Sequence, residues 1–186
     1  MPLPTPRNWP LSAIADHDRG NIKTRFIEKS RANKASLERL SSSDFVEEAI
    51  CRYLRALNAP LKAVAAPLLS GQNWQTLDVA YGSAGEPDMA GLSTPAFGIA
   101  ETGTIAFFSQ TGSPTLLNFA PKIAIAILNE SRIVGSFEEI WGTLDPAAMP
   151  RAINLVSGPS RTGDIEQTMY LGAHGPKYLH ILLIEG

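Results

Sequence analysis

Residues 156–180, VSGPSRTGDIEQTMYLGAHGPKYLH, contain two Gly-Pro turns on either side of a stretch with helical character. We predict that a strand over Ile153–Ser157 ends at the first turn, and that a helix over Asp164–Leu171 opens at Thr162-Gly163-Asp164. The second Gly-Pro turn would end that helix before a final strand over Leu179–Ile184. Strands that alternate with helices in this way predict an α/β fold with a mostly parallel central sheet flanked by helices.

Further strands are predicted upstream. From Leu61 onward, short apolar runs are separated by turn residues. The two runs that flank the turn Glu101-Thr102-Gly103 would form an antiparallel unit around residues 92–108. Ser136, with Glu139 three residues later, predicts a capped helix that reaches about Leu144. The predicted strands are Lys62–Ala66, Thr76–Ala80, Ala96–Ala100, Thr104–Phe108 and Ile123–Leu128.

The first 60 residues are expected to form a proline-rich tail followed by helices. Asn21–Leu40 lacks Pro and Gly and is rich in helix-favouring residues, which predicts one helix. Asp44 and Glu47 resemble a capping box for a second helix that contains Cys51. We therefore expect a single domain over residues 1–186, with an N-terminal tail and helices (1–60) and an α/β core (61–186).

Composition restricts the class of protein. Hydrophobic residues make up 44% and charged residues 18% of 186 positions, which predicts a globular domain with a substantial core. A net charge of −2 gives little support to nucleic-acid binding. No apolar run approaches the roughly 20 residues of a membrane span. Prolines occupy the place where a secretory signal has its apolar segment, so we expect a cytoplasmic protein.

The cysteine content bears on cofactors. One cysteine, Cys51, excludes an internal disulfide and argues against an iron–sulfur cluster held by this chain alone, because such clusters need several thiolate ligands. No His/Cys/carboxylate spacing matches a metal site, and neither the Walker A pattern nor the dinucleotide-binding glycine pattern occurs. We therefore expect no cofactor in this chain and a structural role for Cys51.

Glu101 is the first candidate for chemistry. Within residues 89–129 the only charged side chains are Glu101 and Lys122. A carboxylate in such an apolar stretch is partly desolvated unless it reaches the surface, and desolvation raises its pKa toward that of a general acid or base. Thr102 adds a hydroxyl, and Gly103 lets the backbone approach a ligand closely. The alternative, of equal weight, is an exposed carboxylate at a hairpin tip that has no function.

A second candidate cluster lies at the predicted helix start. Acidic residues and hydroxyls are favoured there for structural reasons alone. Arg161 is not, because the helix dipole disfavours a cation at that end. It is better explained if it pairs with Asp164, with Glu101, or with a bound carboxylate or phosphate. Together with Thr102 and Gly103, the predicted ligand-binding residues are Gly158, Ser160, Arg161, Thr162, Glu166 and His174.

The histidines are expected to have modest roles. His174 precedes the second Gly-Pro turn, where a cationic ring is favoured at a helix C-terminus, and proton transfer is the alternative. His180 begins the last predicted strand and is expected to face solvent.

The stretch Arg19–Arg39 holds seven basic residues and two acidic ones. It is either the solvated face of a helix or a docking surface for an acidic partner.

Three segments carry a family resemblance: GIAETGTIAFFS (98–109), NESRIVGSFEEI (129–140) and SGPSRTGDIEQTMYLGAHGPKYLHILLI (157–184). They resemble the LUD-domain proteins of the LutC/YkgG lactate utilization group, with a dense match from about Leu92 to the C-terminus. Within this match, the elements S-R-T-x-D-I-E and H-G-P are the most specific to that family. Gly163 departs from the Ala expected there, which loosens the helix start but removes no functional group.

The resemblance implies a fold like that of the ribose-5-phosphate isomerase, CoA-transferase and formyltetrahydrofolate cyclo-ligase superfamily. It also implies a part in the bacterial oxidation of L-lactate to pyruvate, alongside iron–sulfur partner proteins. Any cluster chemistry would then belong to those partners, which fits a chain with a single cysteine. The resemblance does not assign a role to any residue of this chain.

Three hypotheses remain open. In the first, a small carboxylate or phosphorylated ligand binds between the Glu101-Thr102-Gly103 turn and the Gly158–Asp164 loop. Arg161 would hold the anion with hydroxyls from Ser160 and Thr162, Glu101 would move a proton, and Asp164 would orient Arg161. In the second, the chain is a non-catalytic assembly or regulatory subunit that docks through Arg19–Arg39. The third, by fold analogy alone, is a sugar-phosphate isomerase or an acyl-transfer enzyme.

Overall fold

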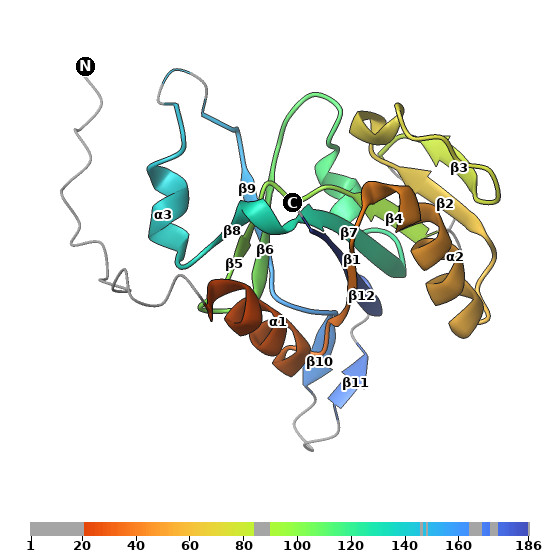
Figure 1. The fold of residues 1–186 in the computed structure, drawn as a ribbon, viewed down its shortest axis with the longest axis horizontal. Coiled ribbons are helices and arrows are strands. Elements are labelled where there is room, and N and C mark those ends of the chain that lie inside the picture. The colour runs from red at the N-terminus through yellow and green to blue at the C-terminus, as the bar shows by residue number, and fades with distance from the viewer. Residues whose placement is uncertain are drawn as a thin grey trace.

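The computed structural model describes residues 21–83, 90–145, 147, 149–163, 169–171 and 175–185, with the backbone alone at 161–163 and 169–171. Its frame is a six-stranded sheet with the order β1-β12-β7-β4-β2-β3, in which every pairing is parallel (Figure 1). The predicted parallel α/β sheet is confirmed. Its strands are β1 (Ser36–Leu40), β2 (Lys62–Ala65), β3 (Asp78–Tyr81), β4 (Ala90–Ser93), β7 (Ile123–Asn129) and β12 (Tyr178–Ile184).

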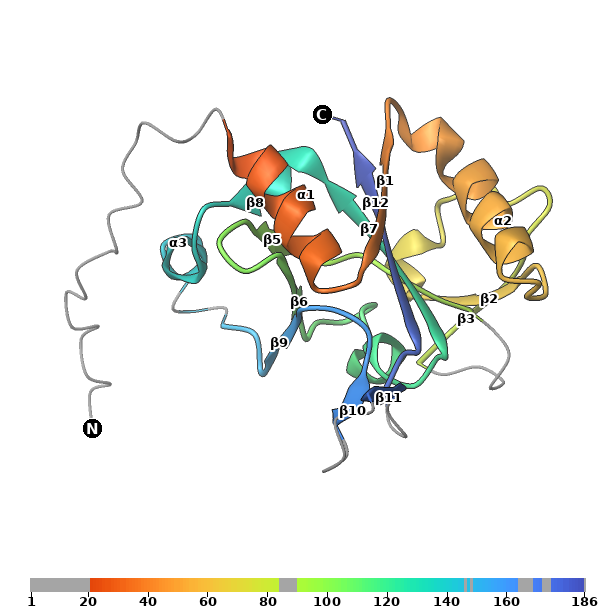
Figure 2. The same ribbon diagram turned by 90° about the horizontal axis from the view of Figure 1, so that it is seen from below.

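Both faces of this sheet are covered, which explains why its central strands are apolar without interruption. Helix α2 (Val46–Ala56) packs on one face, and helix α1 (Ile22–Ala32) lies on the other (Figure 2). Strand β7 serves both faces because its side chains alternate. Ile123, Ile125 and Ile127 point toward α2, and Ala124, Ala126 and Leu128 point toward α1.

A second sheet with the strand order β8-β5-β6-β9 packs beside α1. Its pair β5–β6 is antiparallel, which confirms the predicted antiparallel unit. Helix α3 (Phe137–Trp141) covers the outer side, and the predicted capping box of Ser136 and Glu139 is present. The strands are β5 (Phe97–Ile99), β6 (Thr104–Phe108), β8 (Ile133–Val134) and β9 (Ile153–Val156), and short 3₁₀ helices occupy Ser43–Phe45, Pro67–Leu69, Thr115–Asn118 and Glu130–Arg132.

The prediction of one helix over Asn21–Leu40 is wrong. Helix α1 ends at Ala32, because Lys34 adopts a left-handed conformation with φ 68°. The N–H of Ala35 then donates to the carbonyl of Ser30 (3.0 Å), which closes the helix end. The following residues form β1 and pair in parallel with β12. Sheet pairing with a distant segment therefore overrides local helix propensity in Ser36–Leu40.

The prediction of a helix that opens at Thr162-Gly163-Asp164 and ends at Leu171 is also wrong. Strand β10 (Arg161–Gly163) pairs antiparallel with β11 (Met169–Leu171), while residues 164–168 lie outside the described residues. In the backbone register of this pair, Thr162 is opposite Tyr170, and both are residue types with a high preference for strands. The argument that a helix dipole attracts an anion at this point therefore fails.

Glu47 does not form the predicted capping box with Asp44. The hydroxyl of Ser42 accepts a hydrogen bond from the N–H of Asp44 instead (3.2 Å). The Glu47 carboxylate accepts bonds from the N–H groups of three consecutive residues, Gln75, Thr76 and Leu77, at 2.6–3.0 Å. Burial alone would raise the pKa of Glu47, but these three bonds outweigh it, so the pKa lies below its usual value. Glu47 thus anchors the loop before β3.

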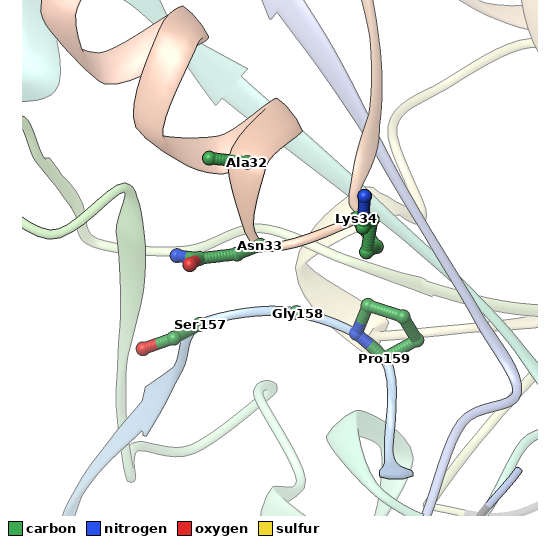
Figure 3. A pocket seen from close by; sticks show the side chains of 6 residues that line it. All are labelled: Ala32, Asn33, Lys34, Ser157, Gly158 and Pro159. Atoms are coloured by element: carbon green, nitrogen blue, oxygen red, sulfur yellow. The ribbon is translucent and has the colours of Figure 1, made fainter. Parts of the chain in front are cut away.

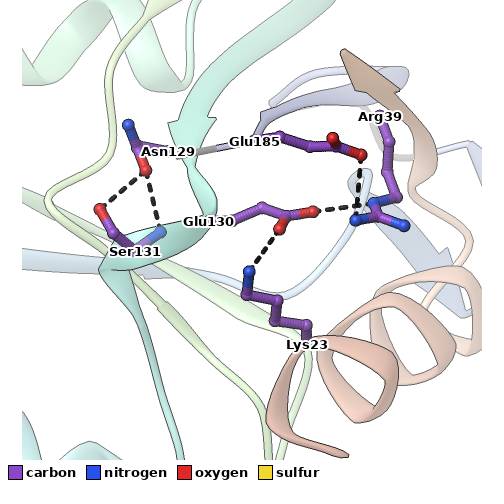
Figure 4. Close-up of polar contacts among 6 residues, drawn as sticks. All are labelled: Lys23, Arg39, Asn129, Glu130, Ser131 and Glu185. Carbon is purple, nitrogen blue, oxygen red and sulfur yellow. Dashed lines mark hydrogen bonds and ion pairs between the residues drawn. The ribbon is translucent and has the colours of Figure 1, made fainter. Parts of the chain in front are cut away.

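Glu130 is a buried carboxylate that joins three elements at the end of β7 (Figure 4). Lys23 of α1 donates to one of its oxygens (2.6 Å), and Arg39 of β1 donates to the other (2.8 Å). Arg39 also pairs with Glu185 (3.1 Å). Burial would raise the pKa of Glu130, but the bonds and charges of Lys23 and Arg39 outweigh it and hold the pKa below its usual value. Lys23 and Arg39 are therefore engaged within the fold.

His180 is buried in β12, and the expectation that it faces solvent is wrong. Its ring stacks on Tyr53 with the ring centroids 3.9 Å apart, and its Nδ1 lies 2.8 Å from the hydroxyl oxygen of Ser36. Its Nε2 has no hydrogen-bond partner in the described part of the chain. Burial, followed by the positive charge of Arg52, lowers the pKa of His180 to about 4.

Because the His180 ring is buried, the free energy of unfolding should depend on pH. The folded-state pKa of about 4 lies below the value of about 6.5 expected in the unfolded chain, so the unfolded state takes up the proton first as the pH falls. Stability should therefore decline between these two values, by up to roughly 3 kcal/mol. Urea unfolding across this pH range, compared with His180→Phe, measures the effect. An equally steep decline in the variant, which keeps a ring on Tyr53, would contradict it.

Candidate functional site

The last turn of α1 contacts both loops that the sequence singled out. The hydroxyl of Ser30 donates to the carbonyl of Gly103 (3.2 Å), and the side-chain amide of Asn33 donates to the carbonyl of Thr102 (2.7 Å). On the other side, the backbone of Gly158 lies so close that a Cβ there would be 2.3 Å from the carbonyl oxygen of Asn33. The two loops therefore meet at one helix end.

A chain of hydroxyls also joins the two loops directly. The hydroxyl of Thr102 donates to that of Thr104 (2.8 Å), and the Thr104 oxygen lies 2.6 Å from the hydroxyl oxygen of Ser157. Thr104 begins β6 and Ser157 follows β9, and these two strands pair antiparallel in the second sheet. The register of that sheet thus places Thr102 and Ser157 at the same end of the molecule.

An open cleft of about 440 Å³ lies between the end of α1 and the loop after β9 (Figure 3). In Figure 3 the amide of Asn33 and the hydroxyl of Ser157 point to the same side of the cleft, while Lys34 stands across from Pro159. The cleft has a cation, an amide and a hydroxyl at its rim. Its lining residues are Ala32, Asn33, Lys34, Ser157, Gly158 and Pro159.

Lys34 is the least expected residue of this cleft. A left-handed conformation costs a residue with a side chain about 1 kcal/mol or more, and helices usually place Gly or Asn there. Residues held in such conformations are concentrated at functional sites. Sequence reasoning missed Lys34 and Asn33 because it placed both inside a continuous helix. Asn33 followed by Lys34, after a helix-favouring run, is a weak signal for a helix end.

Glu101 is half-buried and lies beside the start of α3. Its carboxylate accepts a bond from the N–H of Phe137 (3.3 Å), and its own N–H donates to the carbonyl of Gly135 (3.0 Å). A carboxylate at the N-terminus of a helix is favoured for structural reasons. Glu101 is thus neither an exposed hairpin tip nor directed into the cleft, and its part in proton transfer stays a prediction.

Gly103 has a packing role in the structure. It is buried, has φ 67°, and a Cβ there would lie 2.3 Å from the backbone nitrogen of Ser30. The close approach that its missing side chain permits is made by helix α1. Whether a ligand also contacts Gly103 stays a prediction.

The two Gly-Pro turns meet at the base of the β10–β11 hairpin. The N–H of Ser160 donates to the carbonyl of Pro176 (2.8 Å), and a Cβ on Gly175 would lie 3.1 Å from the Cβ of Ser160. The β10–β11 hairpin therefore begins beside the cleft. The side chains of Arg161 and Thr162, and all of Asp164, Glu166 and His174, lie outside the described residues, so their predicted roles stay predictions.

The described residues offer no metal site and no membrane-spanning helix. No three His, Cys, Asp or Glu side chains of the described residues are grouped in a way that could hold a metal ion. Cys51 is buried, as expected of a structural residue. None of the helices in the described ranges has the length and apolar character needed to cross a membrane.

Curated relatives align with about half of this chain. An uncharacterized protein of Neisseria meningitidis is 39% identical over 97 residues, which covers 51% of this chain and 42% of that protein. Lactate utilization protein C of Geobacillus thermodenitrificans is 32% identical over 98 residues, 50% of this chain and 41% of that protein. The protein YkgG of Escherichia coli is 32% identical over 108 residues, 55% and 47% respectively. The chain thus spans less than half the length of these relatives.

A solved structure shares the fold. The crystal structure of a DUF162 family protein from Deinococcus radiodurans matches 89% of this chain and 98% of its own with a TM-score of 0.65, at 21% sequence identity. In addition, residues 83–184 of this chain match the LUD domain family, and this segment includes Thr102, Thr104 and the loop after β9. Because the match covers more than half of the sequence, the chain belongs to the LUD domain family.

Proposed function

We propose that this chain is a component of a bacterial lactate utilization system and binds a small carboxylate or phosphorylated ligand in the cleft at the end of α1. The printed names of several relatives, Lactate utilization protein C, support the first part. The second part depends on one observation: Lys34, in an unfavourable conformation, lines a cleft where two loops of the family segment meet α1.

Within this proposal the cation of Lys34 attracts the anion and the hydroxyl of Ser157 hydrogen-bonds to it. Arg161 begins β10 two residues after Pro159, and in this proposal it supplies a second cation. Ser160 and Thr162 supply further hydroxyls, Glu166 and His174 complete the ligand-binding set, and Asp164 orients Arg161. For Glu101 to move a proton, its carboxylate must leave the N–H of Phe137 and turn toward the cleft. Partner proteins that carry iron–sulfur clusters perform the electron transfer.

Replacing Lys34 by Gly should stabilise the fold and weaken ligand binding. Gly adopts φ 68° without steric cost, so the free energy of unfolding should rise by about 1 kcal/mol. The loss of the cation should weaken anion binding about tenfold. Thermal unfolding measures the first effect. Calorimetric titration with L-lactate, pyruvate, inorganic phosphate and ribose 5-phosphate measures the second.

Asn58→Gly is the matched control, because Asn58 holds the corresponding left-handed position (φ 52°) after α2. Asn tolerates that conformation better than Lys, so the gain in stability should be smaller. Ligand binding should not change in this variant. If Lys34→Gly binds every anion as tightly as the parent chain does, the cleft is not the site.

A growth experiment separates catalysis from docking. In the bacterium that encodes this chain, Glu101→Gln should leave the protein folded but abolish growth on L-lactate, because the proton acceptor is lost. Glu28→Gln, on the exposed side of α1, is the control and should grow normally. Normal growth of Glu101→Gln would remove the catalytic role of Glu101.

The rival proposal is a non-catalytic assembly subunit that docks through its basic residues. Fewer of these residues are available for docking than the stretch Arg19–Arg39 suggested. Lys23 and Arg39 are engaged with Glu130, whereas Lys29 and Arg31 are exposed and form no ion pair with a described residue. Charge reversal of Lys29 and Arg31 in the same growth experiment tests this function. Failure to grow in that variant, with normal growth of Glu101→Gln, would favour the assembly role.

A further inference from the structure

A second pocket, of about 370 Å³, lies at the second sheet, between the segment that leads from β4 into β5, the end of β6 and the residues after α3. Thr94 follows the carboxyl end of β4, and Arg132 follows that of β7, the neighbouring strand in the six-stranded sheet. In open parallel sheets, ligands commonly bind beyond the carboxyl ends of the strands. The cleft beside Lys34 lies before the start of β1, so the two pockets are at opposite edges of the sheet and share no residue.

Arg132 is the charged group of this pocket. Its guanidinium carbon lies 5.7 Å from the centroid of the Phe97 ring, and the side chain is exposed. It makes no hydrogen bond or ion pair with a described residue, and the nearby carboxylate of Glu130 is already bound by Lys23 and Arg39. A guanidinium placed over a ring keeps its N–H donors available for an anion.

The remaining wall has two kinds of surface. Phe97, Phe108 and Leu144 present apolar surface, and Thr94, Gln110 and Thr143 present hydroxyl or amide groups. Polar groups and the one cation form the larger part of the exposed wall, which suits the charged end of a small organic acid, and the apolar residues form the smaller part. The single cation selects for one negative charge, and the half-buried side chains of Phe108 and Leu144 offer contact surface for an apolar or planar body.

We propose that this pocket is a binding site for a small organic acid, distinct from the cleft at the end of α1. The carboxylate lies on the guanidinium of Arg132, with hydrogen bonds from Thr94, Gln110 or Thr143. The body of the acid packs against Phe108 and Leu144, because the rings of Phe97 and Phe108 already contact each other with their centroids 5.8 Å apart. This site does not depend on the function proposed for the Lys34 cleft.

Benzoate and its neutral counterpart benzamide are suitable probes, because they share a planar ring and differ in charge. In ¹H–¹⁵N spectra of the full chain, benzoate should shift the amide signals of Phe97, Gln110 and Thr143. Benzamide should bind about tenfold more weakly, since it cannot form the charge-assisted pair. Equal affinities, no binding of benzoate, or signal shifts confined to the Lys34 cleft would overturn the proposal.

Variants of Arg132 complete the test. Arg132→Gln should weaken benzoate binding about tenfold, and Arg132→Lys, which keeps the charge but not the planar fork, should lie in between. Arg55→Gln, on the exposed side of α2, should bind benzoate as the parent chain does. The dispersion of the same spectra reports whether each variant is folded. Undiminished binding in folded Arg132→Gln would overturn the proposal.

Discussion

Helix α1 ends against the bare backbone of two glycines, and much of the molecule follows from that contact. Gly103 and Gly158 each leave room for α1 where a Cβ would come within 2.3 Å of its backbone. Both glycines belong to connections of the second sheet, while β1, which follows α1 directly, belongs to the first. The helix end therefore fixes how the two sheets sit on one another. Glu130 makes a second connection of the same kind, between β7, α1 and β1.

The same contact creates the cleft. For β1 to enter the sheet beside β12, the chain must reverse within a few residues of the helix end, and Lys34 makes that reversal in a left-handed conformation. A residue chosen for stability alone would be Gly or Asn. The lysine places a cation between α1 and the loop of Gly158, next to hydroxyls that the register of β6 and β9 brings together. Sheet packing and site geometry thus have one origin.

The sequence predicted those elements whose signal is local. Strand β6 over Thr104–Phe108, the apolar run of β7 and the capping box at Ser136 all lie where the residues indicated. Ser36–Leu40 was misjudged because its partner, the His180 strand, is 144 residues away along the chain, and no local pattern records that pairing. The burial of His180 was missed for the same reason.

The candidate site was predicted in part. Thr102, Gly103 and Gly158 were recognised from turn chemistry, and the structure brings them to one helix end. Asn33 and Lys34 were hidden inside a predicted helix, and Arg132 was hidden because an arginine in a short turn is ordinary in sequence. The ring beneath Arg132 comes from a strand 35 residues earlier, and only the folded chain shows that contact.

The most direct test of the cleft is a titration of the full chain with L-lactate and with phosphate, followed in ¹H–¹⁵N spectra. It shows whether a small anion binds at the end of α1. If it is, the largest shifts will fall on Asn33, Lys34, Thr102 and Gly158, and signals of the distant strand β3 will stay in place. Shifts that avoid these four residues, or that are spread evenly over the molecule, would contradict the assignment of the cleft.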